Sequence, residues 1–499
     1  MNPRLKKFLL VALAAVLLAG VSQVQDALNH DRETLGLTRA QPLENAPPVL
    51  AFTTVALGGF RGLISNLLWA RAADLQEEDK FFEMAQLADW ITKLEPHYTQ
   101  VWIFEAWNMG WNISVKFKDF ADRWRWVRRG MELLRDDALR YNPDEILLYR
   151  ELAWFFQDKM GKNTDDASLY YKRQWAGEMA RVFGNKPANL DELANPVSED
   201  QKARARLLRV EFKMDPRFMK EVNERYGPLE WRLPEAHAIY WAAVGLQKAA
   251  DYPARVNQKD LITLRRVIYQ SMLLSFQRGR LETDPFSKSF EFGPNLDIIP
   301  KVNEAYERNL DEDDIYTEDI QRAHRYFLMQ AVYALYVNNR IPEAGQWFKY
   351  LGEKYPNKAL LGDPDSLPGR LTLDQFAVAS VQEDVNDTSH DRVKSAVEGL
   401  LATSYRNLAL DQDDRATGLK RLALKIYQNY TNKIPKGREE AMGLGPFEVI
   451  NKEVLSRLLD PERGFPPQAR AVLRTKLGLP AESAPAKAEG TPAQDTLPR

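Results

Sequence analysis

The feature that most constrains the fold is a spacing of 34 residues between apolar positions of like size. Leu68 and Trp102 are both large and lie 34 positions apart, and Ala72 and Ala106 are both small and lie 34 positions apart. Pro96 predicts the end of a helix between them, because proline lacks a backbone donor and clashes with the preceding turn. A fixed period of this length is typical of chains that stack one helical hairpin on the next.

Residues between these pairs complete the first helical hairpin, and the same pattern returns farther along the chain. The positions that follow it are Phe81, Glu83, Ala88, Ile91, Ala138, Leu139, Pro143, Tyr149, Leu152, Ala153, Phe156, and then Leu328, Ala331, Leu335, Ile341, Glu343, Ala344, Phe348, Leu351 and Pro356. At these positions the chain resembles the tetratricopeptide repeat (TPR) family, with about three adjacent units in 65–180 and one unit in 325–356. The resemblance implies paired helices that approach through small residues and fill the neighbouring groove with large ones.

Strand patterns are almost missing from the sequence, because period-2 runs of Val, Ile and Thr do not occur. Stripes with a 3.6-residue period are common, and one of them joins Leu419, Leu422, Ala423, Ile426 and Tyr430. Together with the resemblance, this predicts an all-α fold: a right-handed TPR-like helical hairpin solenoid with irregular connector segments.

The composition along the chain predicts seven segments. They are a signal or anchor segment at 1–22, a stalk at 23–48, an N-terminal TPR-like region at 49–184, a proline-rich connector with short helices at 185–235, a middle helical region at 236–371 with a TPR-like hairpin at 325–356, C-terminal helices at 372–477 and a disordered tail at 478–499. Prolines also predict that 281–314 is irregular, and the C-terminal helices are expected to be short.

Residues 1–22 have the order of an export signal. Arg4, Lys6 and Lys7 precede an uncharged apolar run at 8–21, which is shorter than the roughly 20 residues that span a bilayer comfortably. An uncleaved anchor and a cleaved signal both fit this pattern. Because basic residues stay on the cytoplasmic side, we expect a single N-terminal anchor in the cytoplasmic membrane with the bulk of the chain in the periplasm, or an exported protein if the leader is cleaved.

Composition excludes several classes of protein. The 499 residues include no cysteine, which excludes disulfide scaffolds, thiolate zinc sites and cysteine nucleophiles. The formal net charge of -2 carries no sign of nucleic-acid binding. The five histidines are scattered, and no phosphate-binding loop or Gly-x-Ser-x-Gly motif occurs. We therefore expect no enzyme activity, no metal and no cofactor.

The first candidate partner surface is an arginine-rich segment within a tryptophan-rich region. Nine of the 12 tryptophans lie between Trp69 and Trp175, where most are expected to pack between repeats. The candidate residues are Arg123, Trp124, Arg125, Trp126 and Arg128. The two tryptophans are two residues apart on a helix and cannot share a face, so at least one is exposed or contacts another element. This segment suits an anionic or carbohydrate ligand, or else its arginines pair with nearby acids.

The second candidate surface lies in the string from Gly227 to His237, where two prolines fix the backbone between charged and aromatic residues. Its candidate residues are Glu230, Trp231, Arg232 and His237. In one interpretation, the charged members of the string, Glu230, Arg232, Glu235 and His237, line a cleft in which His237 acts near neutral pH. In the other, the string is a rigid entry to the following helix and His237 is structural.

Three functions are compatible with these patterns. The first is a non-catalytic protein-binding scaffold of the bacterial cell envelope, which follows from the leader and from the resemblance to solenoids with concave binding surfaces. The second is an envelope protein that binds or cleaves glycans through the tryptophan–arginine face. The third is a lipid or small-molecule carrier, which requires a closed apolar cavity. Buried indoles would remove the second hypothesis.

Overall fold

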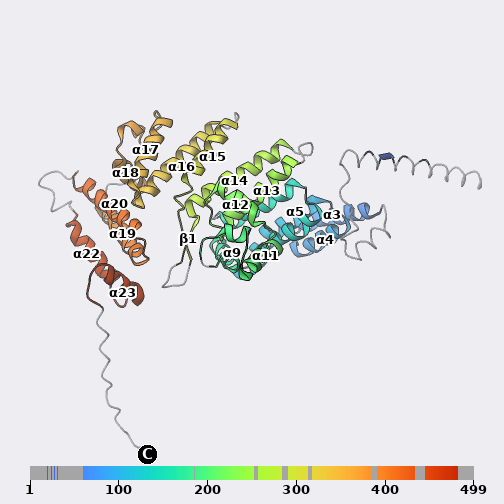
Figure 1. The fold of residues 1–499 in the computed structure, drawn as a ribbon, viewed down its shortest axis with the longest axis horizontal. Helices are drawn as coiled ribbons and strands as arrows, with labels where there is room; N and C mark the ends of the chain where they lie inside the picture. The colour runs from blue at the N-terminus through green and yellow to red at the C-terminus, as the bar shows by residue number, and fades with distance from the viewer. Residues whose placement is uncertain are drawn as a thin grey trace, which may run out of the picture. The chain divides into compact units, whose positions relative to one another are not determined.

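The computed structural model describes residues 60–481 except 163, 185, 252–256, 284–289, 313–316, 385–389 and 433–443, together with a few isolated positions before residue 32. The described chain is mostly α-helical, as the sequence predicts, and its two compact units are Met1–Leu148 and Tyr149–Arg499 (Figure 1). The expected leader at 1–22, stalk at 23–48 and tail at 478–499 lie almost wholly outside the described residues. Within the described residues, no helix combines the length and the apolar character needed to cross a membrane.

The N-terminal unit is built from helices that pair with their neighbours in sequence. Its elements are α3 (Phe60–Glu77), α4 (Phe81–Leu94), α5 (Thr99–Trp107), the π-helix η1 (Asn108–Ile113), the 3-10 helix η2 (Ser114–Lys116), α6 (Phe120–Glu132), the π-helix η3 (Leu133–Ala138), α7 (Leu139–Tyr141) and the start of α8 (Ile146–Trp154). α3 packs on α4, α4 on α5, and α6 on η1.

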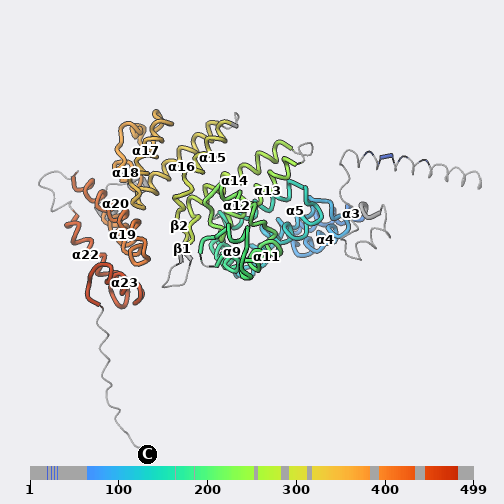
Figure 2. The backbone as a smooth tube through the Cα atoms, viewed as in Figure 1, coloured from blue at the N-terminus to red at the C-terminus, as the bar shows by residue number. Residues whose placement is uncertain are grey.

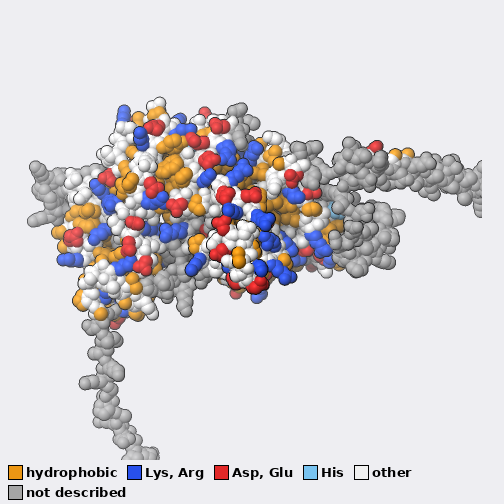
Figure 3. All heavy atoms as spheres, viewed as in Figure 1, with side chains coloured by type: hydrophobic (Ala, Val, Ile, Leu, Met, Phe, Trp, Pro, Cys, Tyr) orange, Lys and Arg blue, Asp and Glu red, His pale blue; other side chains and the backbone are white. Residues whose placement is uncertain are grey.

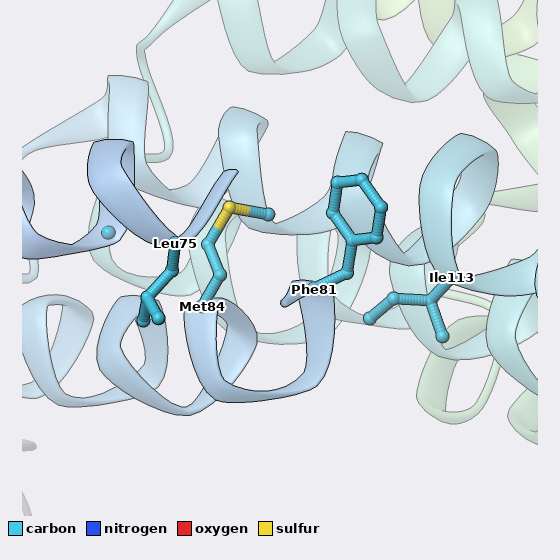
Figure 4. Packing of buried hydrophobic residues seen from close by; sticks show 5 residues of the cluster. Leu75, Phe81, Met84 and Ile113 are labelled. Carbon is cyan, nitrogen blue, oxygen red and sulfur yellow. The ribbon is translucent and has the colours of Figure 1, made fainter. Parts of the chain in front are cut away.

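The core of the N-terminal unit joins these helices through apolar residues. Leu75 of α3, Phe81 and Met84 of α4 and Ile113 of η1 form one buried cluster (Figure 4). The small residues that define the 34-residue spacing, Ala72 and Ala106, are each at most 1% exposed. They lie at the helix contacts, where a small side chain permits close approach.

The C-terminal unit is helical apart from one small sheet. Its further elements are the π-helix η4 (Phe155–Gly161), α9 (Ser168–Phe183), α10 (Leu190–Ala194), α11 (Glu199–Val210), α12 (Pro216–Tyr226), α13 (Pro234–Asp251), α14 (Gln258–Arg278), β1 (Arg280–Thr283), β2 (Phe290–Gly293), α15 (Ile299–Glu312), α16 (Thr317–Val337), α17 (Ile341–Lys354), the 3-10 helix η6 (Pro368–Arg370), α18 (Leu373–Asp384), α19 (His390–Ala409), α20 (Asp413–Thr431), α22 (Phe447–Leu458) and α23 (Pro467–Lys476). The pairs α13/α14, α16/α17 and α19/α20 are the main helical hairpins (Figure 2).

Three hairpins share one turn. Asp79 between α3 and α4, Asn339 between α16 and α17, and Asp411 between α19 and α20 all have φ near +60°. Asn and Asp tolerate this left-handed conformation, which commonly ends a helix. In each turn the next residue donates its N–H to a carbonyl five residues back, at 2.9 Å: Lys80 to Leu75, Arg340 to Leu335 and Gln412 to Asn407. The chain thus reuses the same connection for hairpins in both units.

One part of the C-terminal unit differs from the sequence prediction. β1 and β2 form an antiparallel hairpin in which Arg280 pairs with Gly293 and Thr283 with Phe290. The segment 281–314 was expected to be irregular, yet it contains this hairpin and α15. The prediction was wrong because Pro300 lies in the first turn of α15, where the missing N–H has no helical partner to lose.

The proline-rich connector 185–235, in which the sequence predicts short helices, contains α10, α11 and α12, which pack on one another. Pro216 begins α12 at its first position, after Asp215 caps the helix by accepting a hydrogen bond from the Arg217 N–H at 3.2 Å. Among the C-terminal helices, α18 and α22 have 12 residues each and α23 has 10, whereas α19 has 20 and α20 has 19.

Candidate functional site

The tryptophan–arginine segment forms α6, and its two indoles point to different surroundings. Trp124 is 7% exposed and lies in the core. Trp126 is half-buried and packs edge-on against Phe82 at a ring distance of 5.6 Å and stacks near Phe117 at 6.4 Å. The expectation that the two cannot share a face is confirmed, and neither is a freely exposed platform.

The arginines of α6 have partners within the N-terminal unit. The Arg123 Nε donates to the Phe117 carbonyl at 2.7 Å, Arg125 pairs with Asp122 at 2.7 Å, and Arg128 pairs with Glu132 at 2.9 Å. This arrangement matches the structural alternative in which the arginines pair with nearby acids. Because exposed pairs of this kind contribute little stability, they mainly keep the surface of α6 polar.

The string from 227 to 237 is interior rather than a ligand surface, which corrects the interpretation that it lines an open cleft. Trp231, Arg232 and His237 are 1%, 3% and 0% exposed. Arg232 is neutralised by Glu230 through two hydrogen bonds of 2.8 Å, and the His237 Nε2 lies 2.9 Å from the Trp231 carbonyl. The physical reason is that α13 is buried from its first residue, so the side chains at its start and just before it lie in the core.

A buried ion pair lies beside this string. Lys172 of α9 binds Glu235 of α13, and both side chains are at most 1% exposed. The Lys172 Nζ also lies 5.6 Å from the centre of the Phe292 ring, a cation–π contact. The second carboxylate oxygen of Glu235, Oε2, has no hydrogen-bond partner among the described residues. Sequence reasoning missed this pair because 63 positions separate its members.

An open groove in the C-terminal unit is the feature best suited to binding. It lies among α12, α13, α14 and α15, and consists of a hollow of about 490 Å³ and an adjoining one of about 350 Å³. The two hollows share Arg225, Tyr226, Leu246 and Ala250, so they form one continuous depression. The apolar residues of its larger part are Leu246, Ala249, Ala250, Leu261 and Ile268, with Tyr226 and Tyr269 beside them.

Three arginines from three helices line the larger part of the groove: Arg225 of α12, Arg265 of α14 and Arg308 of α15. Arg225 is exposed and lies over the Tyr226 ring at 5.2 Å. Arg308 pairs with Glu304 at 2.7 Å. The space-filling view shows basic side chains, with acidic ones among them, on the face over α12 and α14 (Figure 3). The sequence did not reveal this site, because only helix packing brings residues from 218 to 308 together.

The sequence matches no family model, no curated protein and no solved structure. In the part of the chain that the structure describes, no group of three or more acidic or histidine side chains is arranged to hold a metal ion. The candidate site is therefore defined by the groove's own residues.

Proposed function

We propose that the protein is a non-catalytic scaffold of the bacterial cell envelope that binds partner proteins. Its helical hairpins form a right-handed TPR-like solenoid, and the apolar run at 8–21 holds it at the cytoplasmic membrane with the described units outside the cytoplasm. The single observation that carries the proposal is the open groove among α12–α15.

The shape of the groove favours a protein segment over a small molecule. Small ligands are mostly enclosed, with 70–90% of their surface buried. This depression is open to solvent along two adjoining hollows that follow α12 and α13. An extended or helical segment of a partner fits such a shape, because it needs only one covered face.

The glycan hypothesis loses the feature that motivated it. It requires Trp124, Trp126 and Trp231 to converge on an open cleft, yet Trp124 and Trp231 are buried. The carrier hypothesis requires a closed apolar cavity, whereas the groove is open.

Site-specific photocrosslinking in membranes tests the proposal. The full chain carries a photoreactive amino acid at Gln247, which is exposed and lines the groove, and in a second version at Arg217, which is exposed on α12 but does not line it. We expect a discrete crosslinked partner, identified by mass spectrometry, at Gln247 and not at Arg217. Absence of any protein crosslink at Gln247 would refute the proposed function.

A further inference from the structure

The charge of the groove specifies the partner segment more closely. Among the described residues that line the larger hollow, three are arginines, Arg225, Arg265 and Arg308, and none carries a carboxylate. Glu221 lines only the smaller hollow. We infer that the groove receives an acidic peptide segment whose apolar side chains anchor it; this inference rests on the proposed function.

The guanidinium groups of Arg225 and Arg308 can accept such a partner. Among the described residues, no carboxylate lies within ion-pair distance of Arg225, whose guanidinium lies over the Tyr226 ring. The Glu304 partner of Arg308 is 53% exposed, and an exposed pair is worth so little that a ligand carboxylate can replace it. Guanidinium groups bind carboxylates in two-point contacts, which favours Asp and Glu over neutral side chains.

The floor of the groove is apolar and can bind the apolar side chains of a peptide. Ala249 and Ala250 are small, and they leave space between α12 and α14 that Leu246 and Ile268 border. Leucine or aromatic side chains of a peptide would bury apolar surface there, which favours binding. A segment with alternating acidic and apolar residues therefore satisfies both the floor and the arginines.

Peptide selection on the full chain in detergent tests this inference. The probe is a library of random peptides displayed on phage, and the readout is the composition of the bound peptides and their affinity by fluorescence anisotropy. We expect enrichment of Asp and Glu together with Leu, Phe and Tyr. The double variant Arg225→Gln/Arg265→Gln should weaken binding on the order of tenfold, since each exposed pair contributes up to about 1 kcal/mol.

Controls separate charge from folding. Arg217→Gln removes an exposed arginine from the same helix outside the groove and should leave the affinity unchanged. Arg225→Lys keeps the positive charge but loses the two-point contact, so it should weaken binding less than Arg225→Gln does. Circular dichroism of each variant confirms that it is folded.

Three results would overturn the inference. The first is that selected peptides show no acidic preference, and the second is that their Glu→Gln versions bind equally well. The third is that short-chain phosphatidylserine binds through these arginines while no peptide does, which would make a lipid the occupant. A partner crosslinked at Gln247 that binds without acidic preference would leave the proposed function intact. Conversely, arginine-dependent peptide binding without any crosslinked partner would refute only the proposed function.

Discussion

At the scale of residues, buried ionisable side chains determine how the stability of the fold depends on pH and on mutation. Glu105 of α5 is 3% exposed, and its Oε2 has no hydrogen-bond partner among the described residues. Burial, reinforced by the negative charge of Asp89, raises the pKa of Glu105 to about 8, and Arg129 only partly opposes this. Glu105 is therefore a neutral carboxylic acid at neutral pH.

The raised pKa of Glu105 predicts a pH-dependent stability of α5. Because the folded state holds the proton between pH 4.5 and about 8, stability is greatest below that window and falls as the pH rises through it. We expect a loss on the order of a few kcal/mol. Hydrogen exchange of α5 at several pH values measures it, and Glu105→Gln should flatten the dependence. An unchanged slope in Glu105→Gln would contradict this account.

The buried pair of Lys172 and Glu235 predicts a second effect. Lys172→Met leaves the Glu235 carboxylate buried and uncompensated, which should lower the free energy of unfolding by about 3–5 kcal/mol. Lys172→Met/Glu235→Gln removes both charges and should recover part of that loss. Denaturant unfolding of the single and double variants measures the difference. A double variant that is no more stable than the single one would argue against this role of the charge.

At the scale of elements, close approach between helices is set by glycine and alanine. A side-chain carbon at Gly418 of α20 would lie 2.2 Å from the Val337 carbonyl oxygen and 2.9 Å from the Asn339 nitrogen, both at the end of α16. Backbone atoms cannot yield as a flexible side chain can. The contact between α16 and α20 therefore depends on this glycine.

Gly418→Ala should destabilise the C-terminal unit by about 1–3 kcal/mol through overpacking. The matched control is Gly399→Ala in α19, where no atom lies within 4 Å of the added carbon. There we expect a gain of about 0.5–1 kcal/mol, because alanine loses less backbone entropy on folding than glycine. Thermal unfolding of the two variants measures both effects, and equal shifts would show that α20 can move away from α16.

The same scale explains which elements could be predicted. Leu419, Leu422, Ala423 and Ile426 of the predicted stripe are buried and Tyr430 is half-buried, because a 3.6-residue repeat is a local property of one helix. α15 was missed because Pro300 was interpreted as a breaker rather than as a first-turn residue. β1 and β2 were missed because four-residue strands are too short to show a period.

At the scale of the whole molecule, local patterns do not locate the site. The sequence predicts candidate sites in the strings rich in tryptophan, arginine and proline. In the structure, most of these residues lie in the core or form ion pairs. The groove residues are ordinary in sequence and become distinctive only where α12, α13, α14 and α15 meet. No spacing of residues in the sequence predicts the contact among these four helices.

Filling the groove tests the central claim most directly. Ala250 is exposed at the point where the two hollows join, so Ala250→Trp blocks the groove without entering the core. We predict that this variant, at normal abundance in membranes and with normal thermal stability, loses the partner crosslink formed from Gln247. Persistence of the same crosslink at wild-type yield in Ala250→Trp would contradict the claim that the groove binds the partner.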